Sequence, residues 1–142
     1  MKTREAHALW KGNLKNGTGT LKLNSIERKF QYNFASRFEE GEFTNPEELI
    51  AAAHAGCFSQ AFSMLLTEKG FEPVSISTTA KVKLVKADGG FRISESFLVT
   101  EADVPGIEEN LFQEIARDAK TNCPVSKALS AIDIKMEASL IQ

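Results

Sequence analysis

Alternating hydrophobic and polar residues predict short β-strands in the first third of the chain. Apolar side chains recur at every second position around Trp10 and again around Leu21, which is the period of a half-buried strand. Between them, the pair Asn16-Gly17 favours a tight hairpin turn. The acidic stretch 36–44 follows and predicts a loop. The expected strands lie at 6–10, 21–23 and 30–32.

The second half of the chain shows the same period over a longer stretch. Apolar or small residues occupy alternate positions over 74–84, and Asp88-Gly89-Gly90 predicts the turn into a second strand. Further along, apolar residues recur at helical spacing, and Pro124 suits the first position of a short helix. The predicted elements are strands at 74–84, 91–99 and 132–140 and helices at 107–119 and 124–130.

A long helix is predicted between these two halves. Asn45 can cap it, Pro46 suits its first turn, and Glu48 stands three residues after the cap. Lys69-Gly70 provides the stop signal, which gives about 24 residues and a length of roughly 36 Å.

The 18 residues from 49 to 66 contain no Asp, Glu, Lys or Arg, a length that could cross a bilayer. Five alanines and several polar residues lower their hydrophobicity. They are therefore more typical of a central helix buried on nearly all sides of a soluble protein.

These elements predict the α+β class, with antiparallel sheets around a long buried helix. No repeat, linker or change of composition divides the chain, so we expect a single domain over 1–142. With 142 residues, 42% hydrophobic and 25% charged, the composition is that of an ordinary soluble domain. The net charge of −2 leaves no basic excess for nucleic acid. The N-terminus lacks the features of a signal peptide, which predicts a reducing cytoplasmic location and disfavours a permanent disulfide.

Two cysteines carry the candidate chemistry. Cys57 falls inside the long helix, and Cys123 immediately precedes Pro124, where free N–H groups and the helix dipole favour a thiolate. Arg37 is the sole formally cationic residue between Lys29 and Lys69. If its guanidinium covers Cys57, it would lower the thiol pKa, and a nearby carboxylate could hold it by paired hydrogen bonds. The two cysteines then form a redox pair, although free cysteines also often serve only to fill a core.

Other assignments of these residues remain open at this point. His54 stands three residues before Cys57 on nearly the same helical face, so a Cys-His acyl hydrolase or transferase is an alternative. A non-catalytic redox sensor would use the same disulfide as a switch. A zinc site fits poorly, because the two histidines and two cysteines have no compact ligand spacing.

Three motifs resemble one known family. The segment from Arg37 through Cys57 to Ser59, the segment 104–107 and the run Cys123-Pro124-Val125-Ser126 closely resemble the OsmC branch of the OsmC/Ohr family of thiol peroxidases. The order of strands and helices fits that family over the whole chain.

The resemblance implies a fold, an activity and four site residues. Cys57 would be the peroxidatic thiol and Cys123 the resolving thiol, with Arg37 and Glu47 beside the sulfur. The fold would be an intertwined homodimer. The enzyme would reduce organic hydroperoxides, and hydrogen peroxide less efficiently, through a Cys57 sulfenic acid and a Cys57–Cys123 disulfide. A dithiol, including the lipoyl type, would reduce it again, with no metal or other cofactor.

Helix geometry adds one expectation to the resemblance. Glu47 precedes Cys57 by ten residues, about 15 Å of helix rise, which is far for one arginine to bridge along the same helix. We therefore expect Arg37 and Glu47 to act on Cys57 of the other subunit. Four phenylalanines near the proposed site either line an apolar substrate pocket or belong to the core; they are Phe38, Phe43, Phe58 and Phe62.

Overall fold

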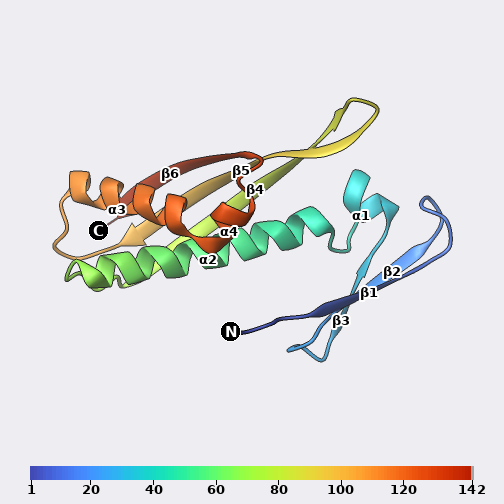
Figure 1. Ribbon diagram of the computed structural model, residues 1–142, viewed down its shortest axis with the longest axis horizontal. Helices are drawn as coiled ribbons and strands as arrows, with labels where there is room; N and C mark the ends of the chain where they lie inside the picture. Colours follow the sequence, from blue (N-terminus) through green and yellow to red (C-terminus); the bar gives the residue numbers. More distant parts are fainter. Residues whose placement is uncertain (142) are drawn as a thin grey trace. The chain divides into compact units, whose positions relative to one another are not determined.

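Ten helices and strands follow one another over residues 1–141, the part of the chain that the computed structural model describes (Figure 1). They form two compact units, residues 1–49 and the residues from 50 onward. The elements are β1 (Ala6–Lys11), β2 (Thr18–Leu23), β3 (Lys29–Tyr32), α1 (Phe34–Phe38), α2 (Pro46–Glu68), β4 (Ser75–Ala87), β5 (Gly90–Asp103), α3 (Glu109–Asn122), α4 (Pro124–Ala128) and β6 (Asp133–Ile141). The mixed α+β class is confirmed, and the single 1–142 domain stays a prediction.

The first unit contains an antiparallel sheet in the order β1-β2-β3. Its three predicted strands are confirmed, but the two-residue turn at Asn16-Gly17 is wrong. The connection runs over residues 12–17, with the Gly17 N–H bound to the Asn13 carbonyl at 2.8 Å. Asn13 also accepts the Asn16 N–H through its side chain at 2.8 Å. The Asn13 side chain therefore organises a wider loop than the Asn-Gly pair predicts.

A short helix, α1, replaces part of the loop expected over 36–44. Its N-terminus is a capping box, in which Asn33 accepts the Ser36 N–H at 2.8 Å and Ser36 Oγ accepts the Asn33 N–H at 2.9 Å. These two bonds satisfy backbone donors that a helix start leaves free. The sequence prediction missed this helix because five residues are too few to show a periodic pattern.

The second unit contains a sheet in the order β4-β5-β6. β4 and β5 form the predicted hairpin, whose turn places Asp88 and Gly89 at positive φ values of 50° and 80°, as a tight hairpin turn requires. β6 pairs with β5 in parallel from Glu95 to Asp103, so the expectation of purely antiparallel sheets is wrong at this edge. A parallel neighbour needs a crossover connection, and α3 and α4 provide it.

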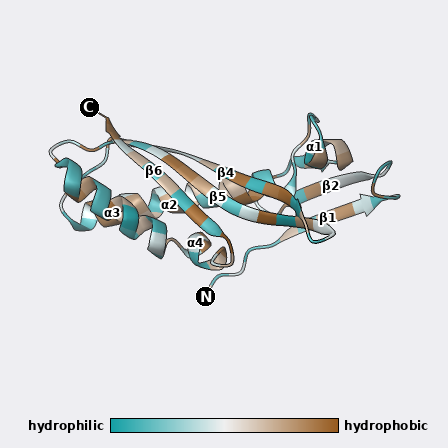
Figure 2. Ribbon diagram, turned by 90° about the horizontal axis from the view of Figure 1, so that it is seen from above, coloured by the Kyte–Doolittle hydropathy of each residue, from teal (hydrophilic) through white to brown (hydrophobic). Residues whose placement is uncertain are grey.

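The helices α2, α3 and α4 cover one face of this sheet (Figures 1 and 2). A stripe along α2 is fully buried against it, consisting of His54, Phe58, Phe62 and Leu66. The aromatic core continues into α3, where Phe112 lies 5.4 Å from the Phe62 ring. The alternation predicted for β4 and β6 is confirmed, since exposed and half-buried residues alternate along both strands.

The opposite face of α2 is exposed in the single chain. It presents mostly small or apolar residues, namely Ala52, Ala53, Gly56, Gln60 and Met64. The expectation of a helix enclosed on nearly all sides is therefore not met within the second unit, whose sheet packs against one side of α2. Among the described residues, α2 is long and apolar enough to cross a membrane by length and composition, a test that core helices of soluble proteins also pass.

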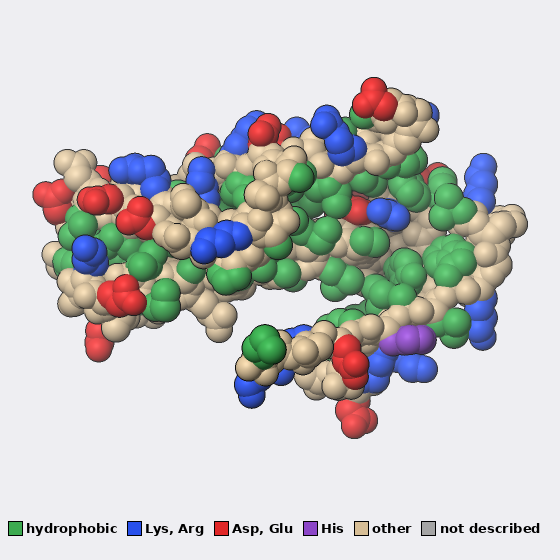
Figure 3. All heavy atoms as spheres, in the orientation of Figure 1, with side chains coloured by type: hydrophobic (Ala, Val, Ile, Leu, Met, Phe, Trp, Pro, Cys, Tyr) green, Lys and Arg blue, Asp and Glu red, His purple; other side chains and the backbone are tan. Residues whose placement is uncertain are grey.

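Charged side chains of both signs intermingle on the face of the molecule drawn in Figure 3. On the outer surface of β5, the Glu95 carboxylate lies 3.8 Å from Lys83 and 3.1 Å from Lys135. Such exposed pairs contribute little to stability. The mixture of charges matches the small net charge and differs from the basic stripe of a nucleic-acid-binding surface.

Candidate active site

The two cysteines meet where α2 passes the junction between α3 and α4. Cys57 is half-buried on α2, and Cys123 is fully buried at the N-cap of α4. Both thiols are free, and their side chains are joined by a hydrogen bond. Residues 66 positions apart in the sequence are thus in direct contact, as the redox-pair interpretation requires.

The surroundings of Cys57 within the chain disfavour its thiolate. Burial raises the pKa of the Cys57 thiol most, and the hydrogen bond that this thiol donates to Cys123 and the charge of Cys123 raise it further. The backbone N–H of Val125 opposes this trend, because its hydrogen bond to the sulfur lowers the pKa. Because an efficient thiol nucleophile has a lowered pKa, these contacts alone do not activate Cys57.

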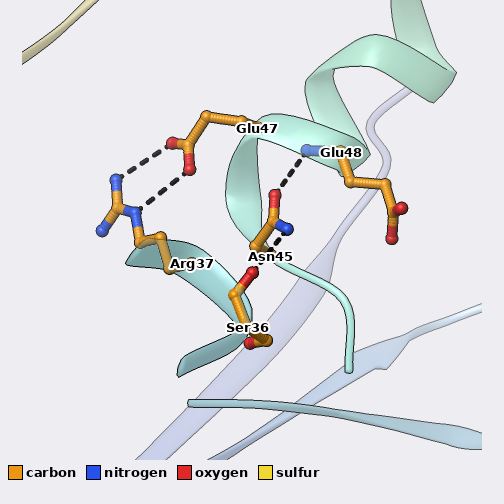
Figure 4. Close-up of polar contacts among 5 residues, drawn as sticks. All are labelled: Ser36, Arg37, Asn45, Glu47 and Glu48. Carbon is orange, nitrogen blue, oxygen red and sulfur yellow. Dashed lines mark hydrogen bonds and ion pairs between the residues drawn. The ribbon is translucent and has the colours of Figure 1, made fainter. Parts of the chain in front are cut away.

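Arg37 is held by Glu47 in a bidentate ion pair within the first unit (Figure 4). Arg37 Nε lies 3.2 Å from one carboxylate oxygen, and Nη2 lies 3.1 Å from the other. Glu47 is only 7% exposed, whereas the Arg37 side chain is 37% exposed. Paired charge-assisted hydrogen bonds fix the orientation of a guanidinium. The carboxylate that holds Arg37 is therefore Glu47, in the first turn of α2.

Asn45 fixes the backbone around this pair. Its side chain accepts the Glu48 N–H at 2.8 Å, which confirms the predicted N-cap of α2. Its amide nitrogen donates to the Ser36 carbonyl of α1 at 2.8 Å. The Glu48 carboxylate binds Thr44 Oγ1 at 2.7 Å. One capping side chain thus ties the helix that carries Arg37 to the helix that carries Glu47.

His54 is engaged away from the thiols. Its Nδ1 lies 2.7 Å from Ser96 Oγ on β5, and its Nε2 lies 2.8 Å from Ser126 Oγ on α4. Burial lowers the pKa of the imidazole, which favours its neutral form. Both ring nitrogens already have hydroxyl partners, so the Cys-His dyad of an acyl hydrolase or transferase has no geometric support. The sequence did not indicate Ser96 and Ser126 as partners of His54, although Ser126 lies within the Cys-Pro-Val-Ser motif.

The phenylalanines near the site divide between two roles. Phe58 and Phe62 are fully buried, which supports the core alternative for these two rings. Phe38 contributes to a hollow of about 270 Å³ in the first unit, and the Arg37 guanidinium lies 5.4 Å from its ring centre. Arg37 also lines this hollow, together with Trp10, Leu14, Tyr32, Asn33 and Phe34. Within residues 1–141, no three His, Cys, Asp or Glu side chains cluster to hold a metal ion.

Comparison with known proteins identifies the family. The family model described as OsmC-like protein matches residues 39–137. The chain belongs to the OsmC family. It is 48% identical to peroxiredoxin OsmC of Escherichia coli (strain K12) over 129 residues, which cover 90% of each protein. It is 35% identical to the organic hydroperoxide resistance protein OhrB of Bacillus subtilis (strain 168) over 97 residues, 66% of this chain and 68% of OhrB.

Solved structures of OsmC-family proteins share the fold. The crystal structure of Bacillus subtilis OhrB has a TM-score of 0.75 at 28% identity, covering 95% of this chain and 98% of OhrB. An organic hydroperoxide resistance protein from Elizabethkingia anophelis has a TM-score of 0.76 at 25% identity, covering 99% of this chain and 100% of that one. The higher identity to OsmC than to OhrB agrees with the OsmC branch expected from the motifs.

Proposed function

We propose that this protein is a thiol-dependent peroxidase that reduces organic hydroperoxides to alcohols, and hydrogen peroxide less efficiently. The observation that carries the proposal is the hydrogen-bonded pair of free thiols, Cys57 and Cys123, in a chain of the OsmC family. The relatives are named peroxiredoxin and organic hydroperoxide resistance protein, which supports this substrate class. We expect a soluble enzyme of the reducing cytoplasm, where its thiols would be kept available.

The reaction follows from the two thiols. The Cys57 thiolate attacks the terminal oxygen of the peroxide, the O–O bond breaks, and the alkoxide takes a proton to leave as the alcohol. The Cys57 sulfenic acid then condenses with the Cys123 thiol, which forms the disulfide and releases water. An external dithiol, including the lipoyl type, is oxidised in turn and restores both thiols. The chain supplies both thiols, and the peroxide and the dithiol are the other reactants.

Arg37 would supply the positive charge that Cys57 lacks within its own surroundings. The guanidinium would lower the thiol pKa and stabilise the charge that develops on the leaving alkoxide. We propose that Arg37 of the partner subunit performs this role in a homodimer, oriented by the partner's Glu47. The apolar, exposed face of α2 supports such an assembly, because a second subunit would bury it.

Oxidation by one equivalent of cumene hydroperoxide tests the reaction. Mass spectrometry of the digested protein should show a Cys57–Cys123 disulfide, and stopped-flow measurements with excess dithiol should show repeated turnover. A single oxidation without turnover would make the protein a redox sensor and reject the catalytic proposal. Absence of the disulfide would reject the roles of both cysteines.

Mixing two inactive variants tests whether Arg37 of one subunit acts on Cys57 of the other. One chain carries Arg37→Ala, and the other carries Cys57→Ser. Random pairing of equal amounts makes about half of the dimers mixed, each with one complete site of two, so activity should recover to about one quarter of wild type. If Arg37 acts within its own chain, the mixture stays inactive.

A further inference from the structure

A buried histidine connects three elements of the second unit. His54 on α2 is bound by Ser96 of β5 and Ser126 of α4, at 2.7 and 2.8 Å. His54 and Ser96 are fully buried, and Ser126 is 5% exposed. A neutral imidazole has one N–H donor and one nitrogen acceptor, so one serine accepts a hydrogen bond from the ring and the other donates to it. Loss of either hydroxyl would leave a buried nitrogen unpaired.

The same short segment, residues 123–126, meets α2 at two successive points. Cys123 and the N–H of Val125 contact the sulfur of Cys57. Ser126 contacts His54, one turn earlier on the same face of α2. The segment that carries the second thiol is therefore attached to the helix that carries the first thiol by one sulfur contact and one imidazole contact.

These two attachments would behave differently during the reaction. Oxidation of Cys57 to a sulfenic acid adds an oxygen to the sulfur, which changes the hydrogen bond between Cys57 and Cys123. The His54–Ser126 bond contains no reacting atom, and it is unaffected by that step. It is thus the attachment that persists while the second thiol must reach the oxidised sulfur.

We propose that His54 is a positioning residue for disulfide formation, acting through Ser126 to hold Cys123 against the Cys57 sulfenic acid. The inference rests on the proposed peroxidase function. In the step concerned, the Cys123 sulfur attacks the Cys57 sulfur, the S–O bond breaks, and the hydroxyl leaves as water with the Cys123 proton. His54 exchanges no proton in this step; it fixes the distance and direction of attack.

Ser96 provides a matched control for this role. Ser96→Ala and Ser126→Ala each remove one serine hydroxyl that binds the His54 ring, and the two hydroxyls lie at nearly the same distance from their ring nitrogens. Only Ser126 belongs to the segment with the second thiol, whereas β5 carries no cysteine. A purely structural role predicts equal effects from the two substitutions, and a positioning role predicts unequal ones.

The experiment measures the condensation step alone. Each protein is oxidised with one equivalent of cumene hydroperoxide, and the sulfenic acid is trapped with dimedone at successive times. Ser126→Ala should slow disulfide formation by about three- to tenfold, the value of one hydrogen bond, and should increase sulfinic acid formation when a second equivalent of hydroperoxide is added. Ser96→Ala should change the rate less than about twofold at a similar loss of thermal stability, and Ser126→Thr should restore it by keeping the hydroxyl.

Two histidine variants repeat the test should Ser126→Ala fail to fold. The amide of Gln reaches the position of Nε2, which faces Ser126, and the amide of Asn reaches that of Nδ1, which faces Ser96. His54→Gln should form the disulfide faster than His54→Asn. Equal rates in both pairs of variants would overturn the inference while leaving the peroxidase intact. Failure of the wild-type protein to form the disulfide would instead reject the proposed function.

Discussion

Replacing Glu47 with Gln should weaken catalysis through the orientation of Arg37. Glu47 binds the guanidinium by two hydrogen bonds, at 3.2 and 3.1 Å. A Gln amide keeps one oxygen acceptor and presents an NH₂ group where the second oxygen stood, so one charge-assisted bond is lost. Such a bond is worth about 1.5–3 kcal/mol when well shielded. Because the Arg37 side chain is 37% exposed, solvent screening reduces this to roughly 1 kcal/mol.

This loss converts into a measurable rate. Since about 1.4 kcal/mol corresponds to a factor of ten, kcat/KM for cumene hydroperoxide should fall by about three- to tenfold. The pKa of the Cys57 thiol should rise, because a less fixed guanidinium stabilises the thiolate less. Stopped-flow kinetics gives the first quantity, and the ultraviolet absorbance of the thiolate against pH gives the second.

Glu48→Gln is the matched control for this prediction. It removes the same charge from the same turn of α2, but the Glu48 carboxylate binds Thr44. Its kcat/KM and its thiol pKa should stay close to those of the wild-type protein. Equal behaviour of the two variants would refute the reasoning, because Glu47 would then have no specific role beyond its charge near the helix start.

Three further predictions follow from buried groups of the second unit. Cys123→Ser should reduce one equivalent of peroxide, leaving Cys57 as a sulfenic acid, but lose turnover with dithiol, and a second equivalent of peroxide should convert Cys57 to a sulfinic acid that mass spectrometry detects; full turnover would exclude a resolving role. The lowered pKa of His54 means that the unfolded chain binds more protons below pH 6.5, so stability in urea should fall on acidification by at most about 1.4 kcal/mol per pH unit. In His54→Asn, the unfolding free energy should lose this part of its dependence on pH, and an unchanged dependence would contradict the assignment to His54. Phe62→Ala should cost about 3–5 kcal/mol of unfolding free energy, since the ring is fully buried, whereas Phe43→Ala, at a position 39% exposed, should cost far less; similar costs would contradict the assigned core.

The sequence predicts well those features that depend on neighbouring residues. The strand faces of β4 and β6 follow from alternation, and the start of α2 follows from Asn45 and Pro46. Alternation identifies which side chains share a face but not the direction of the partner strand, so it could not reveal the parallel pairing of β6 with β5. The absence of charged residues over 49–66 predicted burial of α2 but could not show that the sheet of the second unit covers only one of its faces.

The sequence named candidate site residues but not the contacts that they make. Reactive residue types and motif positions pointed to the two cysteines, Arg37 and Glu47. The bonds of His54 connect it with residues 42 and 72 positions away, and no local pattern records such pairs. Several acidic residues lie near Arg37 in the sequence. Which of them forms its ion pair likewise depends on how α1 packs against the start of α2.

The parallel pairing of β6 with β5 has a consequence for how the protein folds. Pairing of strands so far apart along the chain closes a long loop, and such non-local pairing slows folding. Cys123 lies inside that loop, so we expect its approach to Cys57 to accompany closure of the loop. A newly synthesised chain that still lacks β6 would contain both cysteines without the β5–β6 pairing. Oxidation of Cys57 at that stage would come before Cys123 is held in place to form the disulfide.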